Sequence, residues 1–103
     1  MVSGLPFHGT LRWLPPEDGG LRSPFPSDHW CRPAWIEPGD LRLTASLVIE
    51  NIVPNERVSS NVTAWWLAWE NLSEEEWTVR PGDVLAVTEG PKVVAYLTVE
   101  AVD

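Results

Sequence analysis

The chain has 103 residues and a formal net charge of −8, a size that fits one domain, spanning residues 1–103, with a modest core. An acidic chain lacks the basic surface that nucleic-acid binding needs, so nucleic acids and anionic membranes are not expected partners, whereas basic protein surfaces are. No apolar run approaches the roughly 20 residues that span a bilayer. Ten prolines and seven glycines favour strands and turns over long helices.

The cellular compartment is predicted from the cysteine count and from the start of the sequence. Cys31 is the only cysteine, so no internal disulfide can form, which is typical of a reducing compartment. The first residues have neither the basic nor the apolar segment of a secretory signal. We therefore expect a cytoplasmic protein.

The first predicted elements are two strands separated by an irregular excursion. A strand over residues 10–14 is ended by two prolines, whose missing amide donors stop ladder pairing. Residues 21–28, with Pro24 among them, are predicted to form a loop. Extended structure resumes over residues 30–36 and ends at a Glu-Pro-Gly-Asp turn.

The clearest predicted strand covers residues 41–50, because apolar and polar side chains alternate there with a period of two. The face expected to point into the core carries Leu41, Leu43, Ala45, Leu47 and Ile49. Residues 51–61 are predicted to form a long hairpin loop. A strand over residues 62–69 follows and is apolar on both faces.

The last third of the sequence predicts a short helix and a closing hairpin. Residues 73–76 place a serine before three glutamates, which favours a short helix or 3₁₀ turn. Residues 80–83 form a turn before a strand at 84–88. Residues 89–92 form a tight connection to the final strand, 93–102, which is rich in β-branched residues.

About six strands separated by turns in roughly 100 residues, without a βαβ rhythm, predict an all-β protein. This pattern is typical of a small β-barrel or of a β-sandwich with a single core.

Two segments of the sequence resemble the C-terminal β-barrel domain of translation elongation factor Tu. Residues 13–35 contain Glu-Asp-Gly-Gly, Pro-Phe and Arg-Pro in the order in which the first hairpin of that family carries a similar Glu-Gly-Gly, Pro-Phe and Arg-Pro. Residues 85–99 resemble its last hairpin, with an alternating strand, a Glu-Gly turn and a β-branched strand. The resemblance implies the same fold, a small closed all-β Greek-key β-barrel of about six strands, standing here without a GTPase domain.

The chain also departs from the family that it resembles. No Gly-x-x-x-x-Gly-Lys-Ser/Thr phosphate loop precedes the barrel, so no GTP site is expected. Only Glu89 and Gly90 match the family's Arg-Glu-Gly-Gly turn near the tRNA backbone, whereas Thr88 stands where the arginine would be and Pro91 replaces the second glycine. Loss of that cation argues against retained tRNA binding.

Seven tryptophans are the most unusual feature of the composition, and they allow two interpretations. They can fill the core of a small barrel, or they can form an exposed patch that binds another protein. Because the strand at 62–69 is apolar on both faces, we expect at least one of its rings to reach the surface. The predicted interaction residues are Trp65, Trp66, Trp69 and Trp77.

No catalytic or metal-binding constellation is evident. Asp28, His29 and Cys31 are metal-capable, with His8 elsewhere, but structural zinc needs four ligands at defined spacing. We expect no metal, no cofactor and no catalytic residues. The glutamates at 74–76 are interpreted as solvated surface, or as an acidic surface for a basic partner.

The sequence therefore predicts a non-catalytic protein-interaction module, with a second copy of the chain as one candidate partner. The alternative is a translation accessory protein that keeps a ribosome or tRNA association.

Overall fold

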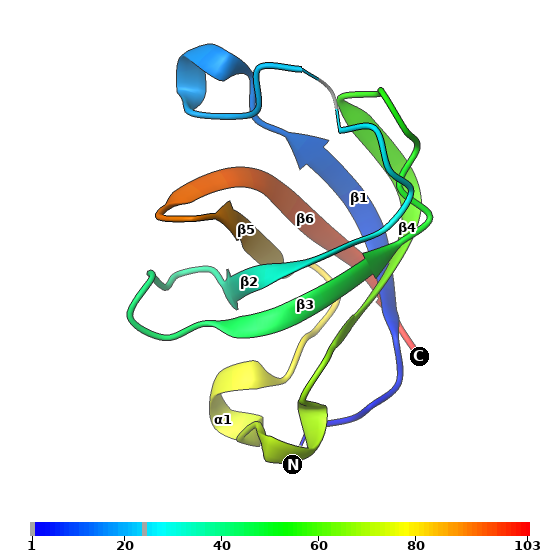
Figure 1. Cartoon of the computed structure of the whole chain (residues 1–103). Coiled ribbons are helices and arrows are strands. Elements are labelled where there is room, and N and C mark those ends of the chain that lie inside the picture. Colours follow the sequence, from blue (N-terminus) through cyan, green and yellow to red (C-terminus); the bar gives the residue numbers. More distant parts are fainter. Residues whose placement is uncertain (1, 24) are drawn as a thin grey trace.

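Six β-strands form the framework of the computed structural model, which describes residues 2–23 and 25–103 (Figure 1). The strands are β1 (Phe7–Trp13), β2 (Trp30–Ile36), β3 (Ala45–Glu50), β4 (Val58–Trp66), β5 (Val84–Glu89) and β6 (Lys92–Val102). The described chain also contains the 3₁₀ segments η1 (Pro16–Asp18) and η2 (Trp69–Asn71) and the helix α1 (Glu74–Trp77). Met1 and Pro24, the latter expected in a loop, lie outside the described residues.

The strands close into a barrel in the order β1-β4-β3-β2-β5-β6, and the neighbouring pairs are antiparallel. Strands β2, β3 and β4 follow one another as neighbours, and β5 returns to lie beside β2, which is a Greek-key arrangement. Closure leaves none of these strands at an open edge. The prediction of a small all-β closed barrel is confirmed.

Alternation along the strands directs every second side chain into the core. Leu47 and Ile49 of β3 are fully buried, and so is Ala64, which lies opposite Ile49 on β4. Leu97 and Val99 of β6 are buried in the same way. Each of these leucine, isoleucine and valine side chains contributes about 1.5–3 kcal/mol through its removal from water.

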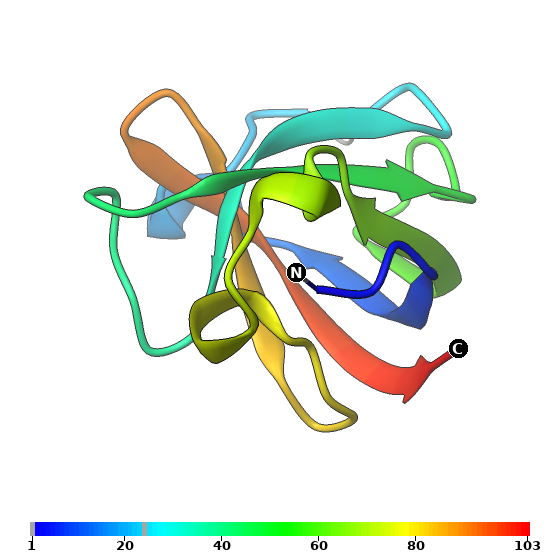
Figure 2. The ribbon, with the colours of Figure 1, turned by 90° about the horizontal axis from the view of Figure 1, so that it is seen from below.

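Aromatic rings pack at both ends of the barrel. At one end the loop after η1 places Phe25 against Trp13 and Trp30, with ring centroids 5.1 and 4.8 Å away. The other end holds α1, η2 and the N-terminal segment, which Figure 2 shows together in front of the barrel. Trp77 of α1 packs there against Trp66, with a centroid distance of 5.0 Å.

The strand expected over residues 41–50 begins only at Ala45. The prediction that Leu41 and Leu43 face the core is wrong, because 47% and 53% of their respective surfaces are exposed. Asp40 explains the difference. Its Oδ1 accepts a hydrogen bond from the backbone amide of Arg42, and its carbonyl accepts one from the amide of Leu43. This side-chain-capped turn removes residues 40–43 from the ladder.

Two further strand boundaries differ from the prediction. β1 begins at Phe7 rather than at residue 10, since it pairs along its whole length with β6. β4 begins at Val58 and ends at Trp66, instead of covering residues 62–69. Turn hydrogen bonds end β4, because the amide of Asn71 donates to the carbonyl of Ala68 and starts η2.

The turn predictions of the last third are confirmed. Residues 74–77 form α1 directly after Ser73. The turn at 80–83 closes by a hydrogen bond from the amide of Asp83 to the carbonyl of Arg80. The Asp83 carboxylate in turn accepts a hydrogen bond from the amide of Arg80. At the β5–β6 connection Gly90 has a φ of 59°, a left-handed conformation that glycine adopts without steric cost.

Candidate interaction surfaces

The structure separates the four tryptophans that the sequence grouped together. Trp66 points inward from β4 and is 2% exposed, and Trp77 is 5% exposed. The indole nitrogen of Trp66 donates a hydrogen bond of 3.1 Å to the carbonyl of Trp77. The expectation that these two rings lie at an interaction surface is therefore wrong for the single chain, because both fill the core.

Trp69 occupies a separate place from Trp65. The prediction that one strand over residues 62–69 includes both is wrong, since Trp69 belongs to η2. Its ring is half-buried under the N-terminal segment: a Cβ added to Gly4 would lie 2.6 Å from a ring carbon of Trp69. Gly4 permits this close approach, which leaves Trp69 partly covered by the chain itself.

Trp65 is half-buried and points outward from β4. Its partner across the ladder is Val48 of β3, whose next partner is Cys31 of β2. Directly paired residues of neighbouring strands share one face of a sheet, so these three side chains form a row on the outside. Leu67, just after β4, is 59% exposed. We call Cys31, Val48, Trp65 and Leu67 the outer stripe.

A hollow of about 360 Å³ adjoins the outer stripe at Val48. It is also lined by Asp28, His29, Glu50 and Asn51. The hydrogen bond of 2.9 Å from His29 Nδ1 lowers the pKa of the Asp28 carboxyl. Among the residues that the structure describes, no group of three or more histidine, cysteine, aspartate or glutamate side chains is arranged to hold a metal ion.

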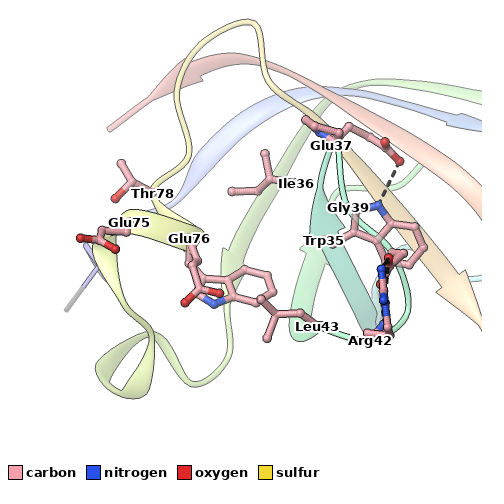
Figure 3. Close-up of a pocket in the computed structure, with 12 residues that line it drawn as sticks. Trp35, Ile36, Glu37, Gly39, Arg42, Leu43, Glu75, Glu76 and Thr78 are labelled. Atoms are coloured by element: carbon pink, nitrogen blue, oxygen red, sulfur yellow. Dashed lines mark hydrogen bonds and ion pairs between the residues drawn. The ribbon is translucent and has the colours of Figure 1, made fainter.

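A larger groove, of about 560 Å³, lies between the β2–β3 connection and α1 (Figure 3). One wall is formed by the end of β2 and the turn after it, and the other by α1 and the residue that follows. In Figure 3, Leu43, Ile36 and Glu76 lie between these walls, and Glu75 and Thr78 lie farther from the β2–β3 connection, beside α1. The lining residues are Trp35, Ile36, Glu37, Pro38, Gly39, Asp40, Arg42, Leu43, Glu75, Glu76, Trp77 and Thr78.

The side chains of the groove are fixed by local contacts. Trp35 donates its indole hydrogen to Glu37 Oε1 at 3.0 Å, and a Cβ at Gly39 would lie 2.7 Å from the Trp35 ring. The turn therefore packs directly on the indole. Across the groove, the Ser73 hydroxyl donates to Glu76 Oε1 at 3.2 Å.

Among the residues that the structure describes, Arg42 is the only cation that lines the groove, and it is already bound. Arg42 Nη2 lies 2.7 Å from Asp40 Oδ2, and its Nε donates to the same carboxylate. These hydrogen bonds hold the pKa of Asp40 below its ordinary value of 3.8. The pairing therefore stabilises the folded chain above pH 3.8, and this contribution is lost as the pH falls through the lower, folded pKa.

Replacing Arg42 with alanine should raise the pKa of Asp40 toward 3.8, because the side-chain hydrogen bonds and the positive charge of Arg42 are removed. Carboxyl resonances followed by NMR through an acid titration measure this change directly. Arg22→Ala removes another exposed arginine and should leave the titration of Asp40 unchanged. An unaltered Asp40 titration in Arg42→Ala would contradict the attribution of the lowered Asp40 pKa to Arg42.

A chain of hydrogen bonds crosses the outside of β4 and β1. Asn51 donates to Thr63 Oγ1, which lies 3.3 Å from His8 Nδ1, and His8 Nε2 lies 3.0 Å from Asp103 Oδ2. A hydroxyl, an imidazole and a carboxylate also follow one another in this order where a catalytic nucleophile is joined to its general base and to the group that orients the base. Neither the hollow beside Val48 nor the larger groove is lined by Thr63 or His8. The chain of bonds holds the end of β6 against β1.

The turn that carries the family resemblance is exposed at Glu89 and Gly90. Thr88 is different, because its side chain is fully buried and its hydroxyl donates to the carbonyl of Pro33 at 2.8 Å. The side chain at this position therefore does not reach the surface of the turn. Arg32 donates to the carbonyl of Thr88, so these contacts tie β5 to β2.

Sequence reasoning missed the groove as a surface, and of the outer stripe it predicted Trp65 alone. The acidic run at 74–76 was a signal for one wall of the groove, but nothing local predicted that the Glu-Pro-Gly-Asp turn would lie opposite. The pairing of Cys31 with Val48 also required the strand register.

Comparison with protein-family models finds no match to the chain, and comparison with curated proteins finds no significant match. The likeness to the elongation factor Tu barrel thus stays a prediction. No helix among the described residues is long and apolar enough to cross a membrane.

Proposed function

We propose that this domain is a non-catalytic protein-interaction module that contacts its partner through the outer stripe. The observation that carries the proposal is the position of Trp65, which stands on the outer face of the barrel beside Val48 and Cys31. A large aromatic ring next to apolar neighbours, on a face that the chain's own core does not need, is typical of an interface anchor.

The surroundings of the outer stripe support a protein as the partner. Polar groups at its edge, among them Glu50 and Asn51 in the adjoining hollow, supply the polar rim that protein interfaces have around an apolar centre. The net charge of −8 disfavours a polyanion. A second copy of the chain is one form of such a partner. A cytoplasmic site of action is part of the proposal, supported by the lone exposed thiol of Cys31.

We expect Trp65→Ala to weaken binding to the partner roughly 30-fold, the effect of losing a hot-spot side chain worth about 2 kcal/mol. The tagged domain would capture the partner, which is then purified and titrated against wild type and variant by calorimetry. Light scattering on the domain alone would detect a second copy as the partner, and Trp65→Ala should then shift the dimer toward monomer.

Val58→Ala is the matched control, because Val58 is an exposed apolar residue at the opposite end of the same strand. It should bind as wild type does. Equal affinity of wild type and Trp65→Ala for the purified partner would overturn the proposal.

A further inference from the structure

The groove between the β2–β3 connection and α1 is a second binding site, separate from the outer stripe, with which it shares no lining residue. We propose that it binds a basic segment of a protein partner, in which lysine or arginine side chains alternate with aliphatic ones. This inference goes beyond the proposed function, since the outer stripe can bind its partner whether or not the groove is occupied.

The size and the apolar lining of the groove point to a chain segment rather than to a small ion. A space of about 560 Å³ lies within the range of sites that enclose organic ligands and side chains. Leu43 lines the groove with 53% of its surface exposed. Ile36 of β2 lines the same groove (Figure 3). An aliphatic side chain placed between them would remove apolar surface from water on both partners.

The charges of the groove favour an occupant with positive charge. Four carboxylates line it, those of Glu37, Asp40, Glu75 and Glu76, against the single guanidinium of Arg42. Arg42 is paired with Asp40, so the other three carboxylates are not neutralised from within the site. No ion pair joins these three glutamates to any residue that the structure describes. The potential in the groove is therefore negative.

Two other arginines of the chain are held elsewhere. Arg57 donates to the carbonyls of Leu14 and Leu21, near the opposite end of the barrel. Arg32 donates to the carbonyl of Thr88 and lies over the ring of Trp30, 5.7 Å from its centroid. A partner that brings its own cations would supply the charge that the groove lacks.

The geometry of the two walls suits an extended segment. Glu37 is oriented by the Trp35 indole on one wall and Glu76 by the Ser73 hydroxyl on the other. In Figure 3 these two carboxylates lie on opposite sides of Ile36. An extended peptide points alternate side chains to one face, so an aliphatic side chain can meet Leu43 while the lysines on either side of it point outward. The long lysine side chains can bend back from there to the carboxylates of the two walls.

The test uses the whole chain and three defined peptides, acetylated and amidated at their ends: Lys-Leu-Lys-Leu-Lys, Lys-Gly-Lys-Gly-Lys and Glu-Leu-Glu-Leu-Glu. Binding is followed by the displacement of backbone amide resonances in NMR. We expect Lys-Leu-Lys-Leu-Lys to shift the amides of Leu43 and Thr78 and to leave those of the β5–β6 turn unchanged. The glycine peptide should bind several-fold more weakly, and the glutamate peptide should not bind.

The double variant Glu37→Gln/Glu76→Gln should weaken binding of Lys-Leu-Lys-Leu-Lys about three- to tenfold, since each exposed charge contributes modestly. Glutamine keeps the oxygen that accepts from Trp35 or Ser73, so the walls are preserved. The matched control is Glu17→Gln/Asp18→Asn, which removes the same charge from η1 at the other end of the barrel (Figure 1) and should leave the affinity unchanged.

Three results would overturn the proposal. Equal weakening by both double variants would show general attraction to an acidic protein. Equal affinity for the leucine and glycine peptides, with no loss in Leu43→Ser, would show a site for small cations instead of a peptide. Resonance shifts confined to residues outside the groove would place the binding elsewhere. Each result leaves the Trp65→Ala measurement, and so the proposed function, unaffected.

Discussion

Trp66→Ala is expected to lower the free energy of unfolding by about 3–5 kcal/mol, the usual cost of removing a large buried aromatic side chain. The ring is 2% exposed and packs edge-on against Trp77 and, at 6.3 Å, against Phe7. Its removal leaves a cavity at the end of the barrel and deprives the carbonyl of Trp77 of its indole donor. Urea denaturation followed by circular dichroism would measure the loss.

The neighbouring residue provides the control. Trp65→Ala removes the same side chain from the same strand, but from its outer face, where the ring is only half-buried. We expect it to cost under about 1.5 kcal/mol, nearer to surface substitutions than to core truncations. Comparable losses in the two variants would contradict the assignment of Trp66 to the core and Trp65 to the outer stripe.

Gly9→Ala is expected to cost about 3 kcal/mol, at the upper end of the penalties for overpacking. A Cβ at Gly9 would lie 1.9 Å from the carbonyl oxygen of Thr98, so β1 and β6 would have to move apart. The register of β1 shifts at Gly9 against both of its neighbours, which indicates bulges that bring the backbones close. Thermal and urea unfolding would measure the effect.

Gly90→Ala separates steric collision from backbone strain. A Cβ at Gly90 meets nothing within 4 Å, but the φ of 59° is left-handed, so alanine should cost only about 1–2 kcal/mol. If Gly9→Ala proved no more costly than Gly90→Ala, the close contact between β1 and β6 would be refuted.

The sequence predicted the elements whose causes are local. The turn at 80–83 and the hairpin at Gly90 follow from glycine, proline and aspartate acting on their own neighbours. The inward direction of Leu47 and Ile49 follows from alternation within one strand. About six strands and tight turns were enough to predict an all-β barrel or sandwich, and the family resemblance favoured the closed barrel.

Strand ends were predicted less well, because they depend on competition between neighbours in space. Residues 41–43 alternate as a strand does, yet Asp40 offers them a side-chain-capped turn instead. Residues 58–61 look like a polar loop, yet Ser59 pairs with Leu11 in β1 and is fully buried. Only the partner strand determines whether such residues join the sheet.

The tryptophans show the same division between local pattern and tertiary structure. Alternation placed Trp65 and Trp66 on opposite faces of one strand, but with apolar residues on both faces it did not say which face was inside. Tertiary structure decided this, because Ala64 and Trp66 lie opposite the buried Ile49 and Leu47 of β3. Likewise the groove exists only because a turn and a helix distant in sequence meet at one end of the barrel, and no local periodicity encodes such a meeting.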